Sequence, residues 1–218
     1  MSTQTLTRTP KTKSYESVIA EIGNLNWTAI DQDDLIGVAW VYYYFSVQFR
    51  ECLEIARGLY PDDERLQELD AGERNTDNLS PWPGVAGAGE KMNHDEFMRR
   101  TLELAKITES RRRSLVKIGE DYLQMTRKMD PQVRALALAS YEDGGLETVF
   151  RAILTAPHWE TTALKAFHHF LAEHIRFDSD PEQGHGALCR HLTPDQRVYP
   201  LWAEFKRMLV EAAPPLNS

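Results

Sequence analysis

The apolar side chains of this chain recur at helical spacing almost throughout its length. No segment shows the sustained alternation of polar and apolar residues that a half-buried strand needs. Residues 35–47 give the clearest example, because apolar and aromatic side chains there cover nearly every direction around a helix. The pattern predicts an all-α fold, a compact single-domain bundle of roughly seven to nine helices.

Prolines, glycines and acidic residues interrupt this pattern where helices are expected to start and stop. The helix over 31–58, capped by Asp31 or Asp33, is predicted to be central and buried on most sides. Gly144 and Gly145 join two helical pieces through a kink or a close contact. The expected helices cover 14–25, 31–58, 61–72, a segment from 94, 110–129, 133–142, 146–156, 158–178, a short piece containing 185, and a segment from 193 that ends before 214.

The length of 218 residues favours one domain, since domains average about 150 residues. We assign it to residues 14–213, with a flexible N-terminal tail over 1–13 and a C-terminal tail over 214–218. Apolar residues make up 42 % and charged residues 27 % of the chain, as in ordinary globular proteins. This composition argues against a disordered acidic tail, a collagen-like chain and a disulfide scaffold.

The charge balance limits the partners that the surface can attract. Thirty-three acidic and 25 basic residues give a net charge of −8, which disfavours nucleic acid and anionic membranes. The longest apolar run, 35–47, is shorter than the roughly 20 residues that span a bilayer. Residues 1–13 lack the apolar run of a secretory signal. Cys52 and Cys189 form no CxxC motif, so we expect a soluble protein of the reducing cytoplasm.

Six of the seven histidines lie between residues 158 and 191. His174 and Asp178 are four residues apart and share a helix face with Phe167, Phe170 and Leu171. A histidine and a carboxylate on a core face must pair with each other or bind a cation, because their burial is otherwise costly. Imidazole and carboxylate together suit iron, manganese or zinc. A hydrogen bond between His174 and Asp178 alone is the simpler interpretation.

Two further segments carry candidate ligands. Glu142 closes an otherwise apolar helical run in SYEDGG, where its carboxylate either caps the kink or turns inward as a ligand. Glu90 and His94 are four residues apart and share a face if their helix begins early. His185 follows Asp178 by seven residues and can return to the same site. The combination of these signals favours a metal site.

These motifs resemble the haem-oxygenase-like superfamily, in particular its branch of di-metal oxidases related to TenA and PqqC. The resemblance covers most of the chain and is carried by GEKMNHDEFMRR, SYEDGGLETVFRAIL and FHHFLAEHIRFDSDPEQGHG. It implies a helical bundle that holds two iron ions, or manganese and iron, between its helices. Classical haem oxygenases carry a haem ligand on an early helix, and no histidine precedes His94 here.

Transferred position by position, the resemblance assigns one ligand set to this chain. It comprises Glu90, His94, Glu142, His174, Asp178 and His185. The early carboxylate is chosen as Glu90 over Glu73 and Asp77, and His185 follows Asp178 at a longer spacing than the family pattern has. Tyr42, Phe45 and Phe49, with Trp40, are candidates to line a substrate pocket, although a core role also explains them.

The resulting hypothesis is a non-haem di-iron or manganese–iron oxidase or oxygenase that acts with O2 on a small organic substrate. The resemblance also implies a possible homodimer. A metal-free enzyme is the alternative, either TenA-like with a cysteine nucleophile such as Cys189 or PqqC-like with a pocket of histidines and arginines. A structural zinc site and a non-enzymatic helical binding module agree less well with histidines on a core face.

Overall fold

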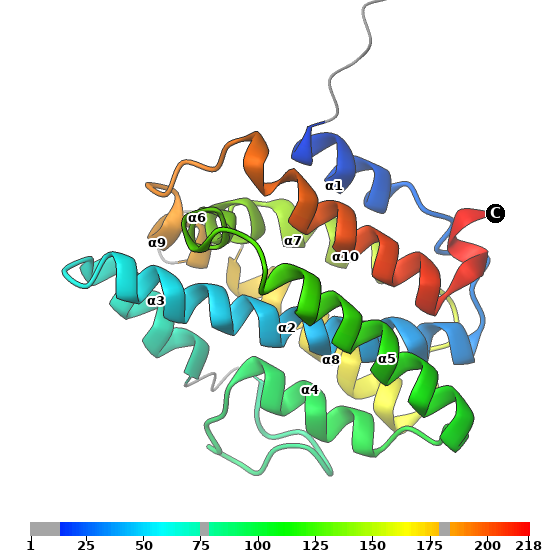
Figure 1. Ribbon diagram of the computed structural model, residues 1–218. Coiled ribbons are helices and arrows are strands. Elements are labelled where there is room, and N and C mark those ends of the chain that lie inside the picture. Colours follow the sequence, from blue (N-terminus) through cyan, green and yellow to red (C-terminus); the bar gives the residue numbers. More distant parts are fainter. Residues whose placement is uncertain (1–13, 75–78, 179–183) are drawn as a thin grey trace, which may run out of the picture.

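The computed structural model describes residues 14–74, 79–178 and 184–218 (Figure 1). Within these ranges the chain forms helices and no strand, apart from an isolated bridge between Trp82 and Ala86, so the all-α prediction is confirmed there. The α-helices are α1 (Tyr15–Gly23), α2 (Gln32–Leu59), α3 (Glu64–Arg74), α4 (His94–Glu103), α5 (Glu109–Thr126), α6 (Pro131–Glu142), α7 (Gly145–Ile153), α8 (Thr162–Asp178), α9 (His185–Cys189) and α10 (Tyr199–Ala212). Two 3-10 helices, η2 (Gln196–Val198) and η3 (Pro214–Asn217), flank α10. The segment around His185 forms a helix of its own, so the described ranges hold ten α-helices where seven to nine were expected.

Helix α2 runs through the middle of the bundle and packs against α3, α4, α5, α6, α8 and α10 (Figure 1). Its N-terminus is closed by Asp31, whose side chain accepts a hydrogen bond from the Asp34 backbone N–H at 2.9 Å. More than half of its residues are buried, from Leu35 near its start to Ala56 near its end. The prediction of a central helix is confirmed.

Helix α3 continues to Arg74, two residues beyond the end expected at Gly72. Leu66, Leu69 and Glu73 are all buried and follow one another at spacings of three and four residues, so they share one face. Glu73 lies beyond the helix expected over 61–72, in the interval before the helix expected from 94, so it was not expected on a helix. The extra half turn instead places its carboxylate on the core side of a helix.

The junction between α6 and α7 depends on two glycines. Gly144 has a φ of +87°, in the left-handed region that favours glycine, and it ends α6. A Cβ on Gly145 would lie 2.0 Å from the backbone oxygen of Ser140. The two helices therefore meet at a contact that has no room for a side chain. This is the close contact that was expected as one of two roles for the glycine pair.

Helix α8 begins at Thr162 and not at His158, since His158 has a φ of +75° that a helix does not accept. The Thr161 hydroxyl accepts a hydrogen bond from the Leu164 backbone N–H at 3.2 Å at this start. At the C-terminus, expected as a tail, residues 214–217 form η3 and Leu216 is buried. No helix among the described residues has the length and apolar character to cross a membrane.

Candidate functional site

Three imidazoles and two carboxylates from five different helices form one buried group, which we call the His–Glu cluster. Its members are Glu73 of α3, His94 of α4, Glu142 of α6, His174 of α8 and His185 of α9. All five side chains are largely buried, and the most exposed of them, that of His94, has 11 % of its surface exposed. Residues more than a hundred positions apart in the sequence thus share a single site.

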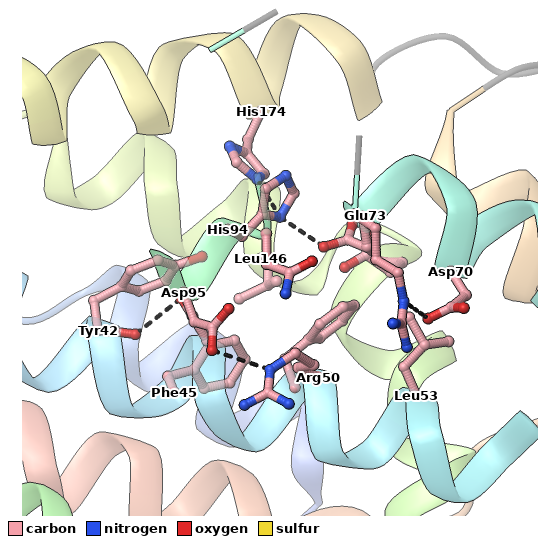
Figure 2. Close-up of a pocket in the computed structure, with 15 residues that line it drawn as sticks. Tyr42, Phe45, Arg50, Leu53, Asp70, Glu73, His94, Asp95, Leu146 and His174 are labelled. Atoms are coloured by element: carbon pink, nitrogen blue, oxygen red, sulfur yellow. Dashed lines mark hydrogen bonds and ion pairs between the residues drawn. The ribbon is translucent and has the colours of Figure 1, made fainter. Parts of the chain in front are cut away.

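Glu73 links the members of the cluster. One of its carboxylate oxygens, Oε2, lies 2.6 Å from Nδ1 of His94, and the other lies 3.0 Å from Nδ1 of His185. His94 Nδ1 is in turn 3.1 Å from Nε2 of His174, and the same His185 nitrogen is 3.5 Å from Oε2 of Glu142. Figure 2 shows Glu73, His94 and His174 pointing toward one another at the edge of a pocket.

Helix ends position three members of the cluster. Glu142 is the last residue of α6, while His94 and His185 are the first residues of α4 and α9. Gly186 allows α9 to approach the end of α6, because a Cβ there would lie 2.9 Å from the backbone oxygen of Glu142. This close approach brings His185 within reach of the Glu142 carboxylate.

His174 occupies the core face of α8, as the sequence predicted. The ring is buried against Phe170, with 4.1 Å between the ring centroids. Its Nδ1 lies 2.7 Å from the backbone oxygen of Phe170, so Nδ1–H donates to that carbonyl and the lone pair is on Nε2. Nε2 faces His94, and a histidine whose other nitrogen is fixed in this way is oriented as metal-ligating histidines are.

Burial and neighbouring charges set the protonation states inside the cluster. Burial alone would raise the pKa of Glu73, but His94 and His185 outweigh it and hold that pKa well below its ordinary range. Burial disfavours the charged form of His185, yet Glu73 and Glu142 raise its pKa well above the usual value. Burial, aided by His94, lowers the pKa of His174 far below the usual value. The cluster therefore holds a Glu73–His185 ion pair beside a neutral His174.

Burial raises the pKa of Glu142, and the nearby negative charge of Glu73 adds to this effect. The same two carboxylates would be drawn to a cation placed between them, because a cation favours the ionised form of both. The cluster thus combines the carboxylate of Glu73, which stays ionised, with the carboxyl group of Glu142, whose charge depends on the groups beside it.

The choice of Glu90 as the early carboxylate is not supported by its position. Its side chain is 39 % exposed and lies 2.7 Å from Nη1 of Arg100, and its other oxygen accepts from the Gly87 backbone N–H. It lies in the turn before α4 and not on that helix, so it does not share a face with His94. Glu73 stands beside His94 in its place. The helical spacing of Leu66, Leu69 and Glu73 is the sequence signal that could have identified Glu73 as a residue on a core face.

Two other candidates lie outside what the structure describes. Asp178 is the last residue of α8, and its side chain is not among the described ones. Asp77, an alternative to Glu90, lies in the segment 75–78. The remaining predicted ligands, His94, Glu142, His174 and His185, all belong to the cluster.

A narrow pocket lies beside the cluster, and the centre of a water molecule can occupy only about 30 Å³ of it. The predicted lining residues Tyr42, Phe45 and Phe49 all contribute to its wall from α2. They are also buried core residues, so both of the roles expected for them apply. Trp40 does not line this pocket.

The two cysteines are placed unfavourably for nucleophilic catalysis. Cys52 and Cys189 are fully buried. Burial raises the pKa of the Cys52 thiol to about 12 and also raises that of Cys189. A catalytic cysteine needs the opposite, a thiolate that persists near neutral pH.

We therefore expect a thiol reagent such as Ellman's reagent to label neither cysteine of the native protein at pH 8. After unfolding, both cysteines should react, which provides the internal control. Rapid native labelling of Cys189, absent in Cys189→Ser, would contradict this expectation and favour a TenA-like thiol.

The members of the cluster contact one another directly. Among the described residues, no group of three or more His, Cys, Asp or Glu side chains is arranged to hold a metal ion. Comparison of the chain with protein families, with curated proteins and with solved structures found no match. The site is therefore interpreted from its own chemistry.

Proposed function

We propose that this protein is a non-haem di-iron, or manganese–iron, oxidase or oxygenase that acts with O2 on a small organic substrate. The observation that carries the proposal is the convergence of three imidazoles and two carboxylates from five helices beside a pocket. Ligand sets of this kind, projecting inward from facing helices, hold pairs of iron or manganese ions in helical bundles.

The imidazole and carboxylate donors of the cluster are of the kinds that such ions prefer, although their described arrangement does not hold an ion. Nε2 of His94 is buried and has no hydrogen-bond partner among the described residues, which is costly unless something else occupies it. His174 presents an unprotonated Nε2 to the cluster, and Glu73 is ionised. Loading requires the direct contacts within the cluster to open. It also releases the proton of His185, because a metal replaces that proton at the ring nitrogen.

Glu73, His94, Glu142, His174 and His185 would hold the two ions, which when bound would supply the two electrons that, with two protons and O2, insert one oxygen atom into a C–H or N–H bond and release the other as water, an external reductant then being needed for the next turnover. This chain's own residues hold and orient the site. The Phe170 carbonyl fixes the ring of His174, and the aromatic wall of α2 limits the water around the substrate. Imidazole and carboxylate side chains together are donors that would suit iron or manganese.

The metal-free alternatives differ in what the structure offers them. The raised pKa values of both cysteines argue against a TenA-like nucleophile. A PqqC-like reaction is favoured by one observation, since two arginines, Arg50 and Arg74, and two histidines, His94 and His174, line the same pocket. That reaction would continue in the presence of a chelator.

Metal analysis of the protein from iron-supplemented cells, purified without chelator, tests the proposal. We expect about two iron ions per chain in the wild type and almost none in His174→Ala. His168→Ala is the matched control, since His168 is an exposed histidine of the same helix, and it should retain the iron. A metal-free wild type that also fails to bind added ferrous iron, or full loading of His174→Ala, would contradict the proposal.

A further inference from the structure

A groove open to solvent lies along α8, apart from the His–Glu cluster. Its lining residues are Trp82, Trp159, Lys165, His168, His169 and Ala172. The four that belong to α8 are three or four positions apart, so they share one helix face, which is not the face of His174. The centres of water molecules can occupy about 400 Å³ of the groove, which therefore has room for a small molecule.

Both tryptophan rings of the groove are held in place by the protein itself. Nε1 of Trp159 donates a hydrogen bond to the backbone oxygen of Ala156 at 2.7 Å, and its ring stands nearly perpendicular to that of His168. The ring of Trp82 stacks on that of His169, with 4.3 Å between the centroids and 15° between the planes. Each indole is still partly exposed. A flat ligand can pack on rings held in this way at little cost in side-chain entropy.

Lys165 gives the groove a positive charge. Its ammonium group makes no hydrogen bond or ion pair within the described ranges. No carboxylate is among the described residues that line the groove, although the chain as a whole has a net charge of −8. An unpaired ammonium beside exposed aromatic rings favours a negatively charged group at this place on an otherwise acidic protein.

The rings and the charge together select one kind of ligand. Indole rings bind planar aromatic molecules by stacking. They also attract cations, but Lys165 repels a cationic ligand, and no carboxylate among the described lining residues offsets that repulsion. An aromatic molecule with a negative charge is the kind that both the tryptophans and Lys165 attract.

We propose that this groove is a binding site for a planar aromatic anion, whose rings pack on Trp82 and Trp159 and whose charged group lies at Lys165. His168 and His169, which belong to the crowded histidines but not to the cluster, support the two indole rings. The groove shares no residue with the cluster, so this proposal does not rest on the proposed function.

Flavin mononucleotide and riboflavin are the matched probes, because they share one aromatic ring system and differ by a phosphate group. Each is titrated with the full-length protein in EDTA, and quenching of the flavin fluorescence reports binding. We expect the mononucleotide to bind at least about threefold more tightly, the effect of one ion pair at an exposed ammonium. Ribose 5-phosphate, which carries the phosphate without the rings, should not displace it at a comparable concentration.

Two substitutions separate the contributions of the rings and the charge. Trp159→Ala should weaken the binding of both flavins about tenfold, because a stacking surface is lost. Lys165→Gln should lower the affinity for the mononucleotide to that for riboflavin and leave riboflavin binding unchanged. Lys117→Gln is the matched control, since Lys117 is an exposed lysine of α5 that does not line the groove. Circular dichroism establishes that each variant is folded, and Trp82→Ala replaces Trp159→Ala if that variant is not.

A preference for the mononucleotide that Lys165→Gln removes, together with weaker binding in Trp159→Ala, supports the proposal, whether or not the protein binds iron. Equal affinity for the two flavins, or affinities that neither variant changes, would overturn it. If neither flavin binds, 2-naphthalenesulfonate is titrated by calorimetry as a smaller aromatic anion and judged by the same two variants. Absence of its binding also overturns the proposal. The iron content of the wild type and of His174→Ala tests the proposed function separately.

Discussion

Replacing Glu73 by alanine should abolish the iron binding that we propose, whereas replacing Glu90 by alanine should leave it intact. Glu73 contacts both His94 and His185, so its loss deprives the proposed centre of a carboxylate that lies between two further ligands. Glu90 is bound by Arg100 at the surface of the loop before α4. Iron content per chain, measured on both variants prepared in parallel with the wild type, should fall only for Glu73.

The same substitution should also weaken the metal-free protein. Glu73 raises the pKa of His185, whose side chain is 4 % exposed, so removal of Glu73 takes from a buried imidazolium the carboxylate at 3.0 Å and leaves that of Glu142 at 3.5 Å. Removing one partner of a buried ion pair lowers the free energy of unfolding by about 3–5 kcal/mol. Glu73→Gln is the milder variant, because its amide keeps the shape and one acceptor oxygen.

Chemical denaturation in EDTA separates the two effects of Glu73. If Glu73→Gln folds with nearly wild-type stability and lacks iron, the loss of metal is due to the missing carboxylate. Iron that is retained in Glu73→Gln and Glu73→Ala but lost in Glu90→Ala would show that the structural assignment of the early ligand is wrong.

Gly145→Ala should destabilise the fold by about 3 kcal/mol or more, the upper part of the range for overpacked sites. The added Cβ would lie 2.0 Å from the backbone oxygen of Ser140 and 2.9 Å from Cζ2 of Trp202. A backbone oxygen cannot move aside by a change of rotamer, so α6 and α7 would have to separate. Trp202 is fully buried and also donates from Nε1 to the Ser140 hydroxyl at 3.0 Å, which ties it to the same junction.

Gly58→Ala is the matched control, because Gly58 lies inside α2 and its Cβ would meet nothing within 4 Å. Alanine there should stabilise the protein by about 0.5–1 kcal/mol, since it restricts the unfolded chain and favours the helix. Urea unfolding followed by circular dichroism measures both variants. A Gly145→Ala protein as stable as the wild type would mean that the α6–α7 contact is looser than the structure has it.

Local patterns in the sequence predicted several features that the structure confirms. The helical period placed His174 on the core face of α8, and the cap at Asp31 and the buried character of α2 also follow from residues close together in the chain. The predicted start of α8 at His158 was wrong by four residues, because the hydrophobic pattern carries no sign of the left-handed backbone at His158. The glycine pair was identified as a kink or close contact, but the crowding atom, a backbone oxygen five residues earlier, was not.

Sequence alone determined the helical class of this protein, the core-facing position of His174 and the group of residues from which the cluster is drawn. These depend on a period of 3.6 residues, which acts within one helix. Only the tertiary structure decided that Glu73 and not Glu90 stands beside His94, and that His185 reaches the same cluster. Those contacts join α3, α4, α6 and α9 across intervening loops, whose path no local periodicity specifies. The same holds for Arg50, whose place in the pocket follows from how α2 and α4 pack.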